Sequence, residues 1–324
     1  MQSGGAPVKW QRSSALLTKK RVGLCPPGMS FIIGLSRKSV SFGEPSPSFV
    51  SCAGIMLRRK PSVVLGMGGY VTVPGGISSF LFGKPLVLMN ADAPLLLSNK
   101  VLKPFAKKMM FGLPSQEKFS DNKCVFTGNS IRREISELPS PQDRYAGRVG
   151  SLRILVVGGS LGAKVLNETV PAALALMPAE SRPRVTHQSG KQHVAALRER
   201  YQQCGVDAEV LDFIDDIPER YASADLVICR AGAITLSELT AAGVASILVP
   251  FVASSTSHQT ANAKWLSGHG GAVFLPQNEM SAEKLAQLLM TMTREKCLEL
   301  AHSAYQLGQR EASTTIADIL EELV

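Results

Sequence analysis

Two short segments in the second half of the chain carry residue types that are suited to phosphate binding. The run Leu152–Ser160 is apolar at first and ends in Gly158, Gly159 and Ser160, and an amphipathic segment follows it. We interpret this as a buried strand, a glycine turn and a helix start. Such a junction favours phosphate through free backbone N–H groups and the helix dipole, and Ser160 adds a hydroxyl donor. Taken alone, the motif fits a tight structural turn equally well.

A second strand-to-helix junction lies at Cys229–Glu238, where an Ala-Gly-Ala turn precedes a helix expected to begin near Ile234. Helical spacing places Thr235 and Glu238 one turn apart on the same side, so the Glu238 carboxylate could accept both hydroxyls of a ribose. The alternative is that Glu238 only complements the helix dipole. We favour the ligand role because both junctions would open at the carboxyl edge of one parallel sheet, where α/β folds bind ligands.

Other polar groups lie near the ends of predicted strands. Arg132 could clamp a pyrophosphate or form a surface salt bridge. The backbone of Ile214 could hydrogen-bond a base edge, and Asp215 or Asp216 is expected to cap a helix over 218–222. Gln259 could contact sugar hydroxyls from a helix start.

The segment Gly66–Tyr70 raises the question of a dinucleotide site, because it follows a predicted strand. The dinucleotide-binding fingerprint G-x-G-x-x-G is incomplete here, because Val71 occupies the position of the third glycine. Asp92 lies beyond the next strand, roughly where a ribose-binding acid would be expected. An NAD site is therefore weakened, but it stays an alternative.

Composition excludes several classes of protein. The net charge of +9 arises in residues 1–60, which hold ten Lys or Arg against the single acid Glu44, so the remaining chain is balanced and no nucleic-acid partner is expected. No apolar run approaches the roughly 20 residues that span a bilayer. Six scattered cysteines without a CxxC pair indicate buried thiols in a reducing cytoplasm, and we expect no metal site.

The chain divides into two blocks of alternating strands and helices, which predict an α/β fold with parallel sheets. We expect an atypical, poorly ordered leader over 1–50, an incomplete N-terminal domain over 51–135 joined by a C-terminal helix at 309–324, and a C-terminal domain over 145–305. A proline-containing linker over 138–143 would separate the blocks.

Taken together, these segments closely resemble one family of bacterial peptidoglycan glycosyltransferases. Its members move N-acetylglucosamine from UDP-N-acetylglucosamine to undecaprenyl-pyrophosphoryl-muramoyl-pentapeptide (lipid I), which gives lipid II. The resemblance runs from about Lys60 to Val324, and several matches in one order are far more specific than a single glycine loop. The matching segments are Gly66–Tyr70 with Pro74–Gly76, Ser98–Lys100, Gly128–Arg132, Gly158–Ala163, His187–Lys191, Phe213–Asp216, Cys229–Glu238 and Gln259–Asn262.

The resemblance implies a GT-B fold, in which two Rossmann-like doubly wound domains face a cleft and the C-terminal domain holds the donor. Arg132 and Ser160 would bind the diphosphate, the Ile214 backbone the uracil, and Gln259 the sugar. The run that holds phosphate and ribose would be Ala233, Ile234, Thr235, Leu236, Ser237 and Glu238, with Glu238 on the ribose, and Gly158, Gly159 and Asp92 are further candidates. The reaction would be a single inverting displacement without a cofactor or metal.

The resemblance also implies peripheral docking on the cytoplasmic face of the inner membrane. Phe80–Phe82 and the basic, leucine-rich stretch from Leu95 to Lys108 fit such a surface, because apolar anchors beside lysines suit anionic lipid. A core helix with a solvated basic face is the alternative.

The chain departs from the family at two places. The family's first glycine loop, Gly-Gly-Thr-Gly-Gly-His, supplies a candidate general base and has no equivalent here, so no catalytic residue is assigned. Met89-Asn-Ala-Asp92 stands where many members have His-Glu-Gln-Asn. Another UDP-sugar enzyme of the same fold, such as an epimerase, and a non-catalytic UDP-sugar-binding remnant therefore stay open.

Overall fold

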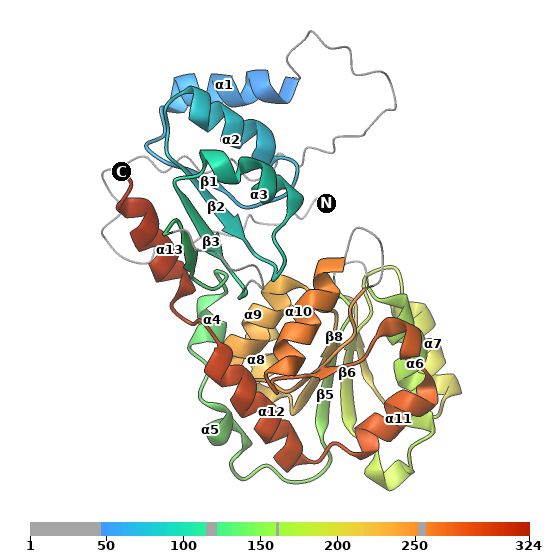
Figure 1. Cartoon of the computed structure of the whole chain (residues 1–324). Coiled ribbons are helices and arrows are strands. Elements are labelled where there is room, and N and C mark those ends of the chain that lie inside the picture. The colour runs from blue at the N-terminus through green and yellow to red at the C-terminus, as the bar shows by residue number, and fades with distance from the viewer. Residues whose placement is uncertain (1–46, 115–121, 160–161, 252–256) are drawn as a thin grey trace, which may run out of the picture.

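The computed structural model of the chain describes residues 47–114, 122–159, 162–251 and 257–324. These residues form two units, each built on a parallel sheet with helices packed against it (Figure 1). The alternation of strands and helices in the sequence predicted this architecture, because a parallel connection needs a crossover, which is usually a helix.

The N-terminal unit contains a four-stranded parallel sheet of order β1-β2-β3-β4. Leu86 and Leu88 face one side of this sheet, toward α2 and α3, while Val87 and Met89 face the other side. The elements are α1 (Pro47–Arg59), β1 (Val64–Gly66), α2 (Thr72–Leu81), β2 (Leu86–Asn90), α3 (Leu97–Leu102), the single-turn helix η1 (Lys103–Phe105), β3 (Lys108–Phe111) and β4 (Cys124–Phe126).

The C-terminal unit contains a six-stranded parallel sheet of order β10-β9-β8-β5-β6-β7. Two short helices, α4 (Arg133–Ser136) and α5 (Pro141–Tyr145), connect the units. The elements that follow are β5 (Arg153–Val157), α6 (Lys164–Ala175), η2 (Ala179–Ser181), β6 (Arg184–Gln188), α7 (Val194–Gln203), β7 (Glu209–Leu211), α8 (Ile217–Ser223), β8 (Leu226–Cys229), α9 (Ala233–Ala242), β9 (Ser246–Leu248), α10 (Ser257–Gly268), β10 (Val273–Phe274), η4 (Gln277–Glu279), α11 (Ala282–Met290) and α12 (Arg294–Leu307).

The last helix, α13 (Ala312–Glu321), returns to the N-terminal unit (Figure 1). Its Ile319 packs with Val87, Met89 and Met110, so residues from opposite ends of the described chain share one core. The face of the N-terminal sheet opposite α2 and α3 is covered in this way.

The strand order of the larger sheet locates a natural binding position. From β5 the chain adds β6 and β7 on one side, and then returns to place β8 on the other side of β5. A crevice for ligands forms at such a switch point, outside the carboxyl ends of the strands. The core supports this edge from both faces, because Ile154 and Val156 enter one apolar cluster and Leu155 enters the other.

Three local predictions were wrong in detail. The basic, leucine-rich stretch around 95–106, which the sequence predicts as one helix, divides into α3 and η1, because Pro104 has no N–H for an α-helical hydrogen bond. The predicted linker contains α5, which Pro141 opens and the Ser140 side chain caps. Helix α1 begins at Pro47, inside the predicted leader, whereas residues 1–46 lie outside the described part of the chain.

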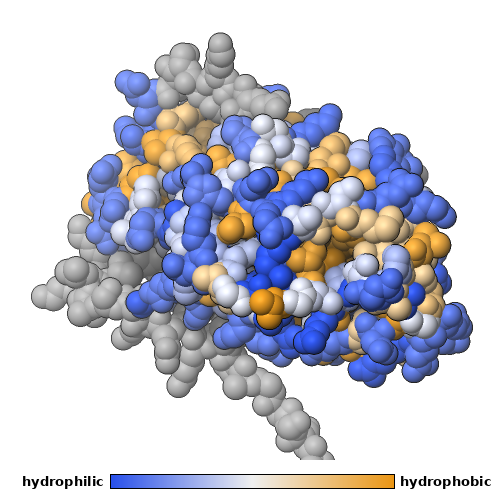
Figure 2. Space-filling model, turned by 90° about the horizontal axis from the view of Figure 1, so that it is seen from below, coloured by the Kyte–Doolittle hydropathy of each residue, from blue (hydrophilic) through white to orange (hydrophobic). Residues whose placement is uncertain are grey.

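Among the described residues, no helix combines the length and the apolar character needed to cross a bilayer. Viewed from below, most of the surface is hydrophilic, with an apolar hollow opening in it (Figure 2). A hollow of about 360 Å³ lies near the start of β5, lined by Leu152, Met177, Leu289 and Met292 among others. It lies at the amino end of the strand, away from the switch point, and we place no nucleotide site there.

Candidate functional site

The two glycine-containing turns singled out in the sequence open at the same edge of the larger sheet. Strands β5 and β8 are parallel neighbours, and Val157 at the end of β5 pairs with Cys229 at the end of β8. The chain then enters α6 after one strand and α9 after the other. Neither helix has a side-chain cap, since the N-cap residues are Ala163 and Gly232. The first amides of both helices therefore lack intrahelical acceptors at the switch point.

The turn after β5 requires glycine and is held by a glutamine. Gly159 has a φ of 81° and Gly162 a φ of 75°, and a Cβ on Gly162 would lie 2.1 Å from the Ser189 carbonyl oxygen. The Gln188 side chain accepts from the Gly159 N–H at 3.0 Å and donates to its carbonyl at 2.9 Å. Ser160 itself lies outside the described residues.

Helix α9 turns only part of its predicted ligand-binding run toward this edge. Leu236 is fully buried in the core, and the Ser237 hydroxyl bonds the side chain of Asn129 at 2.9 Å and the Ala233 carbonyl at 3.0 Å. Ile234 is exposed and Thr235 half-buried. Contacts of Leu236 with a ligand could therefore be made only by its backbone, while the amides of Ala233, Ile234 and Thr235 belong to the free first turn of the helix.

Glu238 lies one helical turn further on and meets Arg132, which comes from the segment after β4. Arg132 Nη1 donates to Glu238 Oε1 at 3.2 Å, with side-chain exposures of 56% and 12%. The structure thus brings together two predicted residues that are 106 positions apart. The Tyr221 hydroxyl, on α8, donates to Glu238 Oε2 at 3.5 Å.

The environment of Glu238 shifts its protonation. Burial raises the pKa of Glu238, while the Arg132 guanidinium and the Tyr221 hydroxyl act in the opposite direction. A half-buried carboxylate with an exposed cation partner can exchange that cation for other hydrogen-bond donors, such as sugar hydroxyls. The group is therefore suited to ligand binding, with a protonation state that responds to its surroundings.

The loop after β7 contains Ile214, whose side chain is buried, beside Phe213, whose side chain is 49% exposed. Sequence reasoning did not single out Phe213, although an exposed aromatic ring is a usual signal for base stacking. The predicted capping by Asp215 or Asp216 was wrong. Asp216 occupies the N-cap position of α8 without capping it, because its carboxylate binds Arg220 at 2.9 Å instead.

Gln259 and Asp92 lie on opposite sides of the junction between the units. Gln259 Oε1 accepts from the Phe251 N–H at 2.9 Å, so the side chain is oriented by the loop that leads to α10. Asp92 accepts from Asn262 Nδ2 at 2.8 Å, and Asn262 Oδ1 accepts from the Ala93 N–H at 2.9 Å. Asp92 is thereby part of a bridge from the loop after β2 to α10.

Sequence reasoning missed the polar residues that connect the units. Asn262 is fully buried and bonds both units, and Asn129 links the Ala91 carbonyl to Ser237. Asn262 stood inside a motif of the family resemblance, but no local pattern reveals a partner 170 residues away. Among the described residues, no group of three or more His, Cys, Asp or Glu side chains is arranged to hold a metal ion.

Comparisons with known proteins agree with this geometry. Residues 153–322 match the glycosyltransferase family 28 C-terminal domain. The chain is 60% identical over 277 residues to the UDP-N-acetylglucosamine–N-acetylmuramyl-(pentapeptide) pyrophosphoryl-undecaprenol N-acetylglucosamine transferase of Janthinobacterium sp., covering 86% of this chain and 77% of that protein. It is 61% identical to the protein of the same name from Herminiimonas arsenicoxydans, with the same coverage.

Solved structures agree as well. The crystal structure of Acinetobacter baumannii MurG matches with a TM-score of 0.75 and 37% identity, over 85% of this chain and 77% of that one. The UDP complex of S. aureus MnaA matches with a TM-score of 0.61 at 15% identity, over 86% and 80% of the two chains, which shows a shared fold alone. The predicted α/β fold of GT-B type is confirmed, and the NAD-binding alternative finds no support.

The matched domain spans the switch-point sheet and both of its uncapped helices, and the similarity to named transferases extends through the N-terminal unit. The chain belongs to the UDP-N-acetylglucosamine–N-acetylmuramyl-(pentapeptide) pyrophosphoryl-undecaprenol N-acetylglucosamine transferases, a group within glycosyltransferase family 28.

Proposed function

We propose that this chain transfers N-acetylglucosamine from UDP-N-acetylglucosamine to lipid I, the undecaprenyl-linked acceptor, and so forms lipid II for peptidoglycan. One observation carries the proposal. Two uncapped helix N-termini and a buried carboxylate lie at one switch point, in a chain 60% identical to transferases of that name. This arrangement provides amide donors for a diphosphate and an acceptor for ribose hydroxyls.

The donor would bind with its diphosphate between the starts of α6 and α9. The amides of Ala233, Ile234 and Thr235 and the Ser160 hydroxyl would then donate to phosphate oxygens, while the Gly158 and Gly159 amides stay bonded to Gln188. Glu238 would accept the ribose hydroxyls once Arg132 leaves it, and Arg132 is long and exposed enough to turn to the diphosphate.

The two ends of the donor would lie against different loops. The uracil would meet the Ile214 backbone and stack on the exposed ring of Phe213. The N-acetylglucosamine would lie toward Gln259, whose side chain the Phe251 N–H orients.

The chemistry would be a single displacement with inversion at the anomeric carbon. The acceptor hydroxyl forms a bond to that carbon and passes its proton to solvent water, while the bond from the carbon to the diphosphate oxygen breaks, so UDP departs as an anion. Helix N-termini and Arg132 stabilise the negative charge that develops on the leaving group. Because the helix amides are fixed before the reaction, they need little reorganisation as the charge develops.

The acceptor would arrive from the membrane through the N-terminal unit. We define the α2–α3 surface as the exposed apolar residues Phe80, Leu81, Phe82, Leu97, Val101 and Phe105 with the neighbouring Lys100 and Lys107. The Phe80 and Phe105 rings lie 4.9 Å apart and join the two helical segments. An apolar surface bordered by lysines suits peripheral docking on the anionic cytoplasmic leaflet.

A transfer assay with labelled UDP-N-acetylglucosamine and a lipid I analogue tests the proposal. We expect labelled lipid II, a strong loss of product for Arg132→Ala and little loss for Arg133→Ala, since Arg133 pairs with Glu137 on the surface. Epimerisation of the sugar without acceptor would instead identify an epimerase. Donor binding without any product would identify a non-catalytic UDP-sugar-binding protein.

A further inference from the structure

Tyr221 is a buried tyrosine whose hydroxyl has one partner. Its side chain is 1% exposed, and among the described residues its hydroxyl contacts only Glu238 Oε2, at 3.5 Å. Buried phenol groups require a hydrogen-bond partner, so this contact fixes where the hydroxyl points. Burial and the neighbouring Glu238 raise the pKa of Tyr221, so the group stays protonated and acts as a donor.

Arg144, from the connecting helix α5, ties together the two helices that carry this pair. Its Nη1 donates to the Tyr221 carbonyl at 3.0 Å, and its Nη2 donates to the carbonyls of Ala242 at 2.5 Å and Gly243 at 2.6 Å. These carbonyls lie in the last turn of α8 and at the end of α9. One guanidinium therefore satisfies the carboxyl ends of both helices, where positive charge is favourable.

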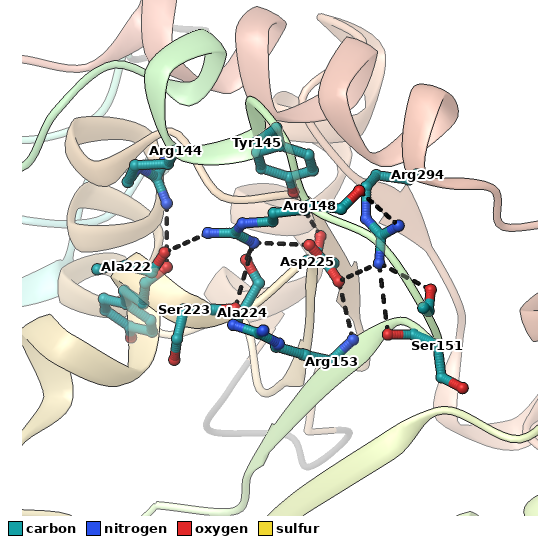
Figure 3. A network of polar contacts seen from close by, with 12 residues as sticks. Arg144, Tyr145, Arg148, Ser151, Arg153, Ala222, Ser223, Ala224, Asp225 and Arg294 are labelled. Carbon is teal, nitrogen blue, oxygen red and sulfur yellow. Dashed lines mark hydrogen bonds and ion pairs between the residues drawn. The ribbon is translucent and has the colours of Figure 1, made fainter.

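Arg148 anchors the end of α8 to the start of β8 (Figure 3). It donates to the carbonyls of Ala222 and Ala224 at 2.5 and 3.0 Å and binds the Asp225 carboxylate at 2.6 Å. Asp225 is fully buried and also accepts from Arg294 at 3.4 Å. Tyr221 thus lies in the last turn of a helix whose carboxyl end is held by two arginines of one segment.

We propose that Tyr221 is a positioning residue for Glu238, and that Arg144 holds Tyr221 in register with α9. The inference rests on the proposed function, because the group that Glu238 would accept is the donor ribose. A carboxylate binds two vicinal hydroxyls well only when its plane is fixed, and Oε2 has a second lone pair that stays free for a ribose hydroxyl. The Tyr221 hydroxyl fixes that plane from the protein side.

The test is a thermodynamic cycle that combines one change in the protein, the loss of the Tyr221 hydroxyl, with one change in the ligand, the loss of the ribose 2′-hydroxyl. Calorimetry would measure the binding of UDP and of 2′-deoxy-UDP to the whole chain and to Tyr221→Phe, which removes only the hydroxyl. We expect the unaltered protein to bind UDP about tenfold more tightly than 2′-deoxy-UDP, which is the effect of one hydrogen bond to a charged group. In Tyr221→Phe the ratio of the two affinities should fall to about twofold to threefold.

Tyr201→Phe is the matched control, since Tyr201 is equally buried in the same unit and its hydroxyl lies 2.9 Å from His187. The ratio of its affinities for UDP and 2′-deoxy-UDP should equal that of the unaltered protein. Arg144→Lys is a second variant, because lysine keeps the charge but cannot span the same carbonyls, and its ratio should be intermediate.

Each outcome of this cycle either supports or overturns the positioning role of Tyr221. An unchanged preference for UDP in Tyr221→Phe and Arg144→Lys, even with weaker overall binding, would assign Tyr221 a purely structural role and overturn the inference. Equal binding of the two nucleotides by the unaltered protein would instead remove the ribose from Glu238. The donor-site assignment would then fail before the positioning role is reached.

Discussion

A strand, a glycine turn and a helix occur in both units. In the N-terminal unit, β1 leads through Gly68 and Gly69 into α2, and the residues beside these glycines, Met67, Tyr70 and Val71, are exposed and apolar. In the C-terminal unit, β5 leads through Gly158 and Gly159 into α6, and the polar side chain of Gln188 brackets the turn.

The same backbone element therefore has apolar neighbours in one unit and polar neighbours in the other. The first turn leads into α2, which carries part of the α2–α3 surface, and this surface suits a lipid-linked acceptor. The second turn lies at the sheet edge where α9 begins, and α9 carries Glu238, which with Arg132 suits a soluble nucleotide. Backbone amides at a helix start recognise an anion in either setting, so the neighbouring side chains determine which anion can approach. The comparison predicts that membrane binding and donor binding can be removed separately.

The largest separation is expected for Leu81→Ser combined with Leu97→Ser. These side chains are 72% and 71% exposed, and burial of each leucine in the lipid interface contributes about 1.5 kcal/mol or more. Binding to lipid vesicles in a sedimentation assay should weaken about a hundredfold, with an unchanged affinity for UDP. Leu176→Ser, an exposed leucine of the other unit, is the control and should have no effect. Equal loss of vesicle binding in the double variant and in Leu176→Ser would contradict the proposed difference between the two units.

Glu238→Ala should have the converse effect, which is weaker donor binding with unchanged membrane binding. Loss of a hydrogen-bonded carboxylate should weaken UDP binding by about 2 kcal/mol, roughly thirtyfold, as measured by calorimetry. Vesicle binding should not change. Glu137→Ala removes a carboxylate that is paired with Arg133 on the surface, and it should leave the UDP affinity as it was. If both variants bind UDP like the unaltered protein, Glu238 is not in the site.

A smaller effect is expected for Lys100→Gln. A lysine near an anionic bilayer contributes about 1 kcal/mol, so binding to vesicles with anionic lipid should weaken about fivefold. The difference should shrink at high salt, because exposed charges are screened. Lys296→Gln, on α12, should not change vesicle binding. A comparable loss of vesicle binding in this variant would indicate a non-specific charge effect.

The smallest and most gradual effect concerns pH. Because burial raises the pKa of Glu238, this carboxylate takes up a proton at a higher pH than an ordinary glutamate does. The protonated form loses an acceptor for ribose, so the affinity for UDP-N-acetylglucosamine should fall as the pH decreases through that raised value. Calorimetry from about pH 8 to about pH 5 should show this decline, and Glu238→Gln should remove it. An identical decline in the variant would assign the titration to another group.

The sequence predicted most strands and the two glycine-containing turns at one edge of the larger sheet, because each depends on local patterns such as an apolar run ending in glycine. It also placed Thr235 and Glu238 on one helix face, since helical periodicity is local. It could not pair Arg132 with Glu238, which are 106 residues apart. The contacts of Arg144 with backbone carbonyls were equally hidden, because carbonyl groups carry no residue-specific signal. Ser160 remains a prediction, because it lies outside the described residues.

The return of α13 to the N-terminal sheet has a consequence for synthesis on the ribosome. Val87, Met89 and Met110 are translated well before Ile319, the residue that covers them, because about 200 residues separate Met110 from Ile319. Until Ile319 is made, one side of that sheet has no cover, and the nascent chain exposes an apolar surface that favours aggregation. A nonsense codon just before Ala312 should therefore yield an aggregating product, even though Arg132, Glu238 and Gln259 have all been made.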